Sequence, residues 1–190
     1  MSLASSTRWI CLAGVAVLLA ISSPGLAAID GTPQALFETL KKPALWRHGL
    51  PVGFRLEIAG GRPLHEHGLL IGEVLVGLRG PDRYQGLAVV VTNSARTAHH
   101  TVMAAIRSNH AVRSLPRGAY GWLSLETGSS SECGVARLRC YESFRFIQSG
   151  VSLLTVMVGS LRRPDAHTSE HLRQLLRFGL AQIKRADNAR

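Results

Sequence analysis

Residues 135–161 read VARLRCYESFRFIQSGVSLLTVMVGSL, and this stretch decides the fold that we expect. The runs Val135 to Ile147 and Val151 to Leu161 are rich in Val, Leu and aromatic residues, as β-strands are. Gln148-Ser149-Gly150 between them is a short polar turn that contains a glycine. The stretch therefore predicts a β-hairpin, and with it an antiparallel sheet.

Further strands are predicted on the N-terminal side of this hairpin. Two runs of apolar residues, Leu69 to Leu78 and Gly86 to Thr92, are joined by a polar segment and predict a second hairpin. Phe54 to Ile58 alternates apolar and charged residues, the period of a half-buried strand, and we expect Gly60 to Pro63 to end it. Residues 119–126 alternate in the same way.

Three segments have helical spacing instead. Apolar residues recur at helical intervals from Thr32 to about Arg47, which predicts a single N-terminal helix. A middle helix is expected to begin at Ala95, with Asn93 or Ser94 as its N-cap.

Pro164-Asp165 and Thr168 predict the start of the last helix. Its apolar residues form one predicted stripe: Leu172, Leu175, Leu176, Gly179, Leu180 and Ile183. The order of elements predicts an α+β fold, in which N-terminal, middle and C-terminal helices pack on an antiparallel sheet of hairpins.

The first 28 residues have the layout of a secretory signal peptide. Arg8 is the only charge before Asp30, Trp9 to Ile21 is an apolar run, and Leu26-Ala27-Ala28 supplies small residues for cleavage. The apolar run is shorter than the roughly 20 residues that a transmembrane helix needs. We therefore expect a signal peptide over 1–28 and one exported domain over 29–190, periplasmic or secreted, without an integral membrane span. An uncleaved anchor is the alternative.

The cysteines of the mature chain would be Cys133 and Cys140. In an oxidising compartment an even pair indicates a disulfide, and this spacing differs from the C-x-x-C of thioredoxin-type redox motifs. We predict a structural bridge, with a redox-active or metal-binding pair as the alternative.

The charge is strongly positive, with 22 Lys and Arg against 12 Asp and Glu and a formal net charge of +10. For an exported protein this favours an anionic envelope component or partner protein over nucleic acid. Two clusters stand out in the sequence: Arg137, Arg139 and Arg145 alternate as on one face of a strand, and Arg162-Arg163 have Arg173 and Arg177 nearby in sequence. Arg96, beside the start of the middle helix, is a further candidate for anion binding. The alternative is that a GC-rich genome fills solvated positions with arginine.

His65-Glu66-His67 is the candidate for a metal site. In an extended segment the two imidazoles share a face and could chelate Cu or Zn. The alternative is a pair of solvated turn histidines, and we expect no other cofactor.

Catalytic motifs are missing from the sequence. Neither G-x-S-x-G nor S-x-x-K occurs, and the four aspartates are placed near turns, helix ends or a terminus. We therefore expect an exported, soluble accessory or binding protein of the cell envelope with a basic surface, and no catalytic residue. The alternatives are a periplasmic metal-binding protein that uses His65 and His67, and a small secreted hydrolase.

Overall fold

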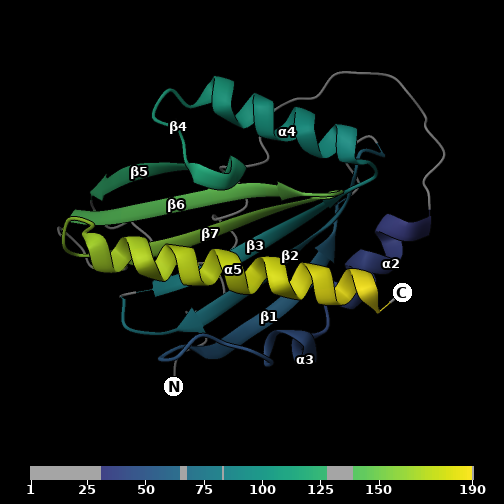
Figure 1. Ribbon diagram of the computed structural model, residues 1–190, viewed down its shortest axis with the longest axis horizontal. Helices are drawn as coiled ribbons and strands as arrows, with labels where there is room; N and C mark the ends of the chain where they lie inside the picture. Colours follow the sequence, from purple (N-terminus) through teal and green to yellow (C-terminus); the bar gives the residue numbers. More distant parts are fainter. Residues whose placement is uncertain (1–30, 65–67, 83, 128–138, 190) are drawn as a thin grey trace.

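The computed structural model describes residues 31–64, 68–82, 84–127 and 139–189. They form one antiparallel sheet of seven strands in the order β1-β2-β3-β7-β6-β5-β4 (Figure 1). The strands are β1 (Arg55–Pro63), β2 (Leu70–Arg79), β3 (Tyr84–Thr92), β4 (Arg113–Ser114), β5 (Tyr120–Thr127), β6 (Arg139–Ser149) and β7 (Ser152–Ser160). The helices are α2 (Gly31–Leu40), α3 (Pro43–Trp46), α4 (Ala95–Ser108) and α5 (Ala166–Asn188), with a 3-10 turn η3 (Pro116–Gly118). The predicted α+β fold is confirmed.

The helices cover both faces of the sheet. Helices α2, α3 and α5 share the larger core with Val89, Leu154 and Val156 of the central strands. Val90 and Leu153, the sequence neighbours of two of these residues, join Val102 of α4 in a smaller core. Because successive strand residues point to opposite faces, α4 lies on the face opposite to α5.

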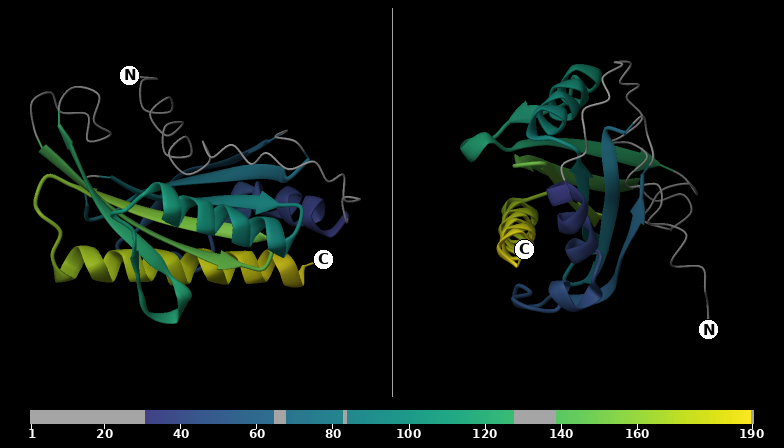
Figure 2. Two further views of the ribbon diagram at one scale, coloured as in Figure 1. Left: turned by 90° about the horizontal axis from the view of Figure 1, so that it is seen from above. Right: turned by 90° about the vertical axis from the view of Figure 1, so that its right-hand side faces the viewer.

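Helix α5 runs along the length of the sheet (Figure 2). It begins at its cap: the Asp165 side chain accepts a hydrogen bond from the Thr168 backbone amide, and the Thr168 hydroxyl accepts one from the Asp165 backbone amide. Gly179 lets the helix approach β7 closely, since a Cβ there would lie 2.8 Å from the Leu154 side chain. The expected cap of the middle helix is also present, with Ser94 accepting from the Thr97 amide.

The single N-terminal helix expected from Thr32 to Arg47 is wrong, because two short helices, α2 and α3, occupy the segment. The break falls at Pro43, which lacks an amide hydrogen and disfavours a helical conformation at Lys42. Lys42 is accordingly extended, with φ −75° and ψ 118°. The turn places Trp46 in the core, where its ring nitrogen donates to the Leu40 carbonyl at 2.6 Å.

The expected end of the first strand at Gly60 is also wrong, since β1 continues to Pro63. Gly61 is needed there for packing, because a Cβ would lie 2.8 Å from the Lys41 side chain and 3.2 Å from the Phe37 ring. An edge strand tolerates Gly and Pro because one of its sides has no ladder to maintain. Glycine therefore marks a close approach of α2 here and not a turn.

No helix in the described ranges is both long and apolar enough to cross a membrane.

Candidate functional site

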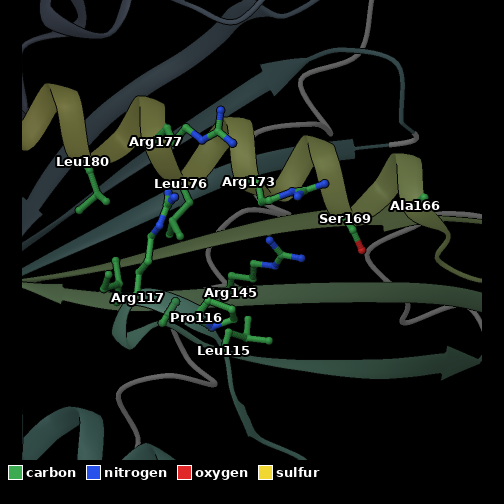
Figure 3. A pocket seen from close by; sticks show the side chains of 12 residues that line it. Leu115, Pro116, Arg117, Arg145, Ala166, Ser169, Arg173, Leu176, Arg177 and Leu180 are labelled. Carbon is green, nitrogen blue, oxygen red and sulfur yellow. The ribbon is translucent and has the colours of Figure 1, made fainter.

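Helix α5, strand β6 and the segment that joins β4 to β5 enclose a pocket of about 550 Å³ (Figure 3). This volume is within the range of sites that hold a drug-sized molecule. Four arginines and mostly apolar residues line it: Leu115, Pro116, Arg117, Ala119, Arg145, Ile147, Ala166, Ser169, Arg173, Leu176, Arg177 and Leu180. We call it the arginine pocket.

One flank of α5 forms the upper wall of the arginine pocket. Arg173 and Arg177 are four residues apart, as are Leu176 and Leu180, so each pair repeats on the same side of the helix. The predicted apolar stripe is buried at Leu172, Leu175 and Ile183, but Leu176 and Leu180 are only half-buried. Phe178 takes the place expected for them in the core. The stripe is thus rotated toward Phe178, which leaves Leu176 and Leu180 to line the pocket.

Arg145 enters the pocket from β6, and Figure 3 shows its side chain directed toward α5 beside that of Arg173. Burial lowers the pKa of Arg145, and the charge of Arg173 lowers it further, while Glu170 acts in the opposite sense. Glu170, however, is already bound to Arg173 at 2.7 Å. Two guanidinium groups therefore share this end of the pocket with one carboxylate.

Arg117 enters from the opposite side, on the turn η3. Its φ of 66° lies in the left-handed region, which residues other than glycine seldom adopt. Gly118 follows with φ +73°, and the Leu115 amide donates to the Ala119 carbonyl across the turn at 2.8 Å. This unusual backbone conformation carries the Arg117 side chain toward α5 (Figure 3).

Gly121 gives the pocket part of its shape. A Cβ at this position would lie 2.8 Å from the Phe144 carbonyl, 3.0 Å from Leu115 and 3.5 Å from the stem of Arg145. The missing side chain thus lets Leu115 fold onto β5 and leaves room for Arg145.

The lining groups are suited to binding an anion that carries an apolar portion. Guanidinium groups hold carboxylates and phosphates through paired hydrogen bonds and stay protonated at physiological pH, so they are poor general acids or bases. The half-buried leucines and Ile147 would contact the apolar part of such a ligand. Ser169 is the only hydroxyl among the lining residues, and Glu170 beside it is engaged by Arg173.

The structure brings only some of the sequence candidates together. Arg173 and Arg177 lie in the arginine pocket, whereas Arg96 is exposed on α4, on the other face of the sheet. Arg137 lies outside the described residues, and Arg139 is the first residue of β6. Arg145, which the sequence groups with Arg137 and Arg139, and Arg117, which the sequence does not single out, complete the pocket.

Other candidates fall wholly or partly outside the described residues. His65 and His67 lie outside them, as do residues 1–28, so the metal site and the signal peptide stay predictions. Cys133 also lies outside, while the backbone of Cys140 belongs to β6, so the disulfide stays a prediction. Within the described ranges, no three His, Cys, Asp or Glu side chains are grouped to hold a metal ion.

Two titratable clusters lie away from the pocket. His171 Nδ1 is 2.6 Å from the Asp82 carboxylate, and the imidazole contacts the rings of His167 and Phe54. These contacts join the β2–β3 turn to the start of α5. Glu73, on the α4 face, is buried and bound to Arg62 at 3.0 Å. Burial raises its pKa, against the opposing effect of Arg62.

Comparisons with known proteins do not assign the chain to a family. No family model matches the sequence, and no curated protein matches it. Among solved structures, the chain is similar to the extracellular domain of PknH from Mycobacterium tuberculosis, with a TM-score of 0.47 and 10% sequence identity. That match covers 80% of this chain and 94% of the other.

Proposed function

We propose that this protein is an exported binding protein of the cell envelope whose arginine pocket takes a drug-sized anionic ligand with an apolar portion. The observation that carries the proposal is the pairing of Arg145 with Arg173. Both face the same cavity, and burial and the neighbouring positive charge disfavour the charged form of Arg145. A carboxylate or phosphate between the two guanidinium groups would stabilise the charged form of Arg145, whereas water only partly screens the repulsion between the two positive charges.

The walls of the pocket narrow the ligand class. A purely ionic ligand would leave the apolar side chains of the pocket exposed to water, whereas a short acyl or aromatic group would cover them. These side chains are Leu115, Ile147, Leu176 and Leu180. The volume of about 550 Å³ suits one such molecule. The same combination of a phosphate and an apolar chain is found in a soluble alkyl phosphate and in an anionic lipid, so the test must separate these two sources.

Calorimetric titration with octyl phosphate, below the concentration at which it forms micelles, tests the proposal. We expect measurable binding that weakens as NaCl is raised, because salt screens the charge contacts. Octyl glucoside has the same chain without the charge and should bind at least tenfold more weakly. Vesicles of phosphatidylglycerol form a separate arm, and binding to vesicles alone would identify the lipid surface as the source.

The informative variant is Arg145→Gln combined with Arg173→Gln. We expect it to weaken octyl phosphate binding at least tenfold, since it removes two charged hydrogen-bond donors from one anion. The matched control is Arg162→Gln combined with Arg163→Gln, which removes the same charge from exposed positions outside the pocket. If both double variants bind as the parent does, the arginine pocket is not the site.

A further inference from the structure

A smaller pocket lies on the opposite face of the sheet, between the end of α4 and the strands β5, β6 and β7. Its volume is about 270 Å³. Leu153 and Thr155 form part of its wall, and both alternate along β7 with Leu154, which packs in the core that α5 shares. The sheet therefore separates this pocket from the arginine pocket. We call it the aromatic pocket, because the rings of Trp122 and Phe146 also line it.

The aromatic pocket exists because α4 packs tightly only along its first half. The buried residues of this helix are Ala98, Thr101 and Val102. Farther along the helix, Ala105 is half-buried and Ser108 is exposed, and both line the pocket. The small side chains at the end of α4 thus leave a space between the helix and the sheet.

The rings of the aromatic pocket are held in place by their neighbours. Trp122 stacks on Phe144, with ring centroids 4.3 Å apart and planes inclined by 7°, and it meets Phe146 at 5.6 Å and 66°. Phe146 in turn stacks on Tyr120 at 5.3 Å. The rings are therefore fixed before a ligand arrives, which lowers the entropy cost of binding. A bound aromatic ring would join them in the edge-to-face or offset arrangement that such rings prefer.

The polar groups of the aromatic pocket are few and uncharged. All eight lining residues, each within the described ranges, are neutral in a chain with a formal net charge of +10. The Thr155 hydroxyl forms no hydrogen bond with another described residue. Asn109 accepts from the Ala111 amide through Oδ1, so its Nδ2 hydrogens are left to donate. A ligand hydroxyl would therefore meet both an acceptor and a donor, whereas a charged group would meet no counter-ion.

We propose that the aromatic pocket binds a neutral, single-ring aromatic molecule with a hydroxyl group, of the phenol class. Five of the eight lining side chains are apolar. A sugar is disfavoured, because its several hydroxyls would lose their water against these side chains without gaining partners. The volume is just below the roughly 300 Å³ at which sites for drug-sized ligands begin, so one ring fits and a larger molecule does not. The site does not depend on an anion in the arginine pocket.

Calorimetric titration with p-cresol tests the proposal, and we expect a dissociation constant below about 1 mM. Ala105→Leu places a larger side chain in the pocket without lowering helix propensity much, and should weaken binding at least tenfold. The matched control is Ala95→Leu, the same change at the exposed first residue of α4. This control should stay within twofold of the parent.

A second variant tests the hydroxyl. Thr155→Val keeps the shape of the side chain and removes its oxygen, so it should weaken p-cresol binding at least threefold. The affinity for toluene, which has no hydroxyl, should stay within twofold. Nuclear magnetic resonance then locates the ligand. The indole N–H signal of Trp122 should shift with p-cresol, whereas that of Trp46, which donates to the Leu40 carbonyl in the other core, should not.

Several results would overturn the proposal: no p-cresol binding in the millimolar range, equal p-cresol affinity in the parent and either pocket variant, or an unmoved Trp122 signal. Glucose bound as tightly as p-cresol would show a sugar site instead. If Ala105→Leu fails to fold by circular dichroism, Thr155→Val and the Trp122 signal decide. Octyl phosphate titration of the same variants separates the two sites, because variants of the aromatic pocket should leave that affinity within twofold of the parent.

Discussion

The two flanks of helix α5 differ although they belong to one continuous helix. On one flank Leu172, Leu175 and Phe178 are buried against the central strands. On the other flank Arg173 and Leu176 face a cavity of about 550 Å³. Two leucines that are neighbours in sequence thus have different environments. The comparison shows that packing on the core flank is sufficient to hold the helix against the sheet. The side chains of the pocket flank are therefore not needed to fill the core and can line a cavity.

The largest effect should come from the core flank. Leu175→Ala removes a fully buried side chain and should lower the free energy of unfolding by about 2–5 kcal/mol. Leu176→Ala, at a half-buried position that lines the pocket, should lower it by less than about 1.5 kcal/mol. Urea denaturation of both variants measures the difference. Equal losses would mean that the two flanks are packed alike.

A smaller effect of opposite sign is expected on the pocket flank. Arg145→Met removes a charge that burial and Arg173 disfavour, so the free energy of unfolding should rise slightly, by an amount that solvent screening keeps small. The same variant should bind octyl phosphate more weakly. Arg173→Met, which removes a more exposed charge bonded to Glu170, serves as the comparison and should not stabilise the protein. If Arg145→Met instead lowers the free energy of unfolding, Arg145 contributes to the stability of the fold.

Glu73, on the face of the sheet that α4 covers, is a second ionisable group whose charge is disfavoured by burial. It can be compared with Arg145 because it has a counter-ion of opposite charge, Arg62, at 3.0 Å. Its pKa is raised by burial, so the folded state favours the protonated carboxyl and this contribution to stability is lost as the pH rises through the raised pKa. Relative to Glu73→Gln, the parent should therefore lose stability between pH 4 and pH 7. Thermal melts of both proteins at several pH values measure the change. A constant difference across this range would exclude a titrating Glu73.

Much of the fold follows from local sequence patterns. The hairpin β6–β7, the hairpin β2–β3 and the cap at Ser94 depend on residues close together in the chain, so alternation and capping rules predict them. The errors at Pro43 and Gly60 have a different origin. The helix breaks at Pro43 in a way that places Trp46 in the core, and the strand continues past Gly60 because Phe37 packs against Gly61. Both outcomes depend on contacts between elements that are distant in the chain, which local patterns do not reveal.

The arginine pocket could be predicted only in part. Arg173 and Arg177 were found because helical spacing places them together, and Arg145 stood out by its alternation in a strand. The sequence grouped Arg145 with Arg137 and Arg139, whereas the structure places it beside Arg173, because α5 returns over β6. Arg117 gives no periodic signal. Its place depends on a single left-handed residue in a turn.

A crystal structure of the protein grown with octyl phosphate tests the central claim most directly, since it locates the ligand. We predict phosphate density between the guanidinium groups of Arg145 and Arg173, with the octyl chain against Leu176 and Leu180. An empty arginine pocket at saturating ligand, or density at another place on the surface, would contradict the account.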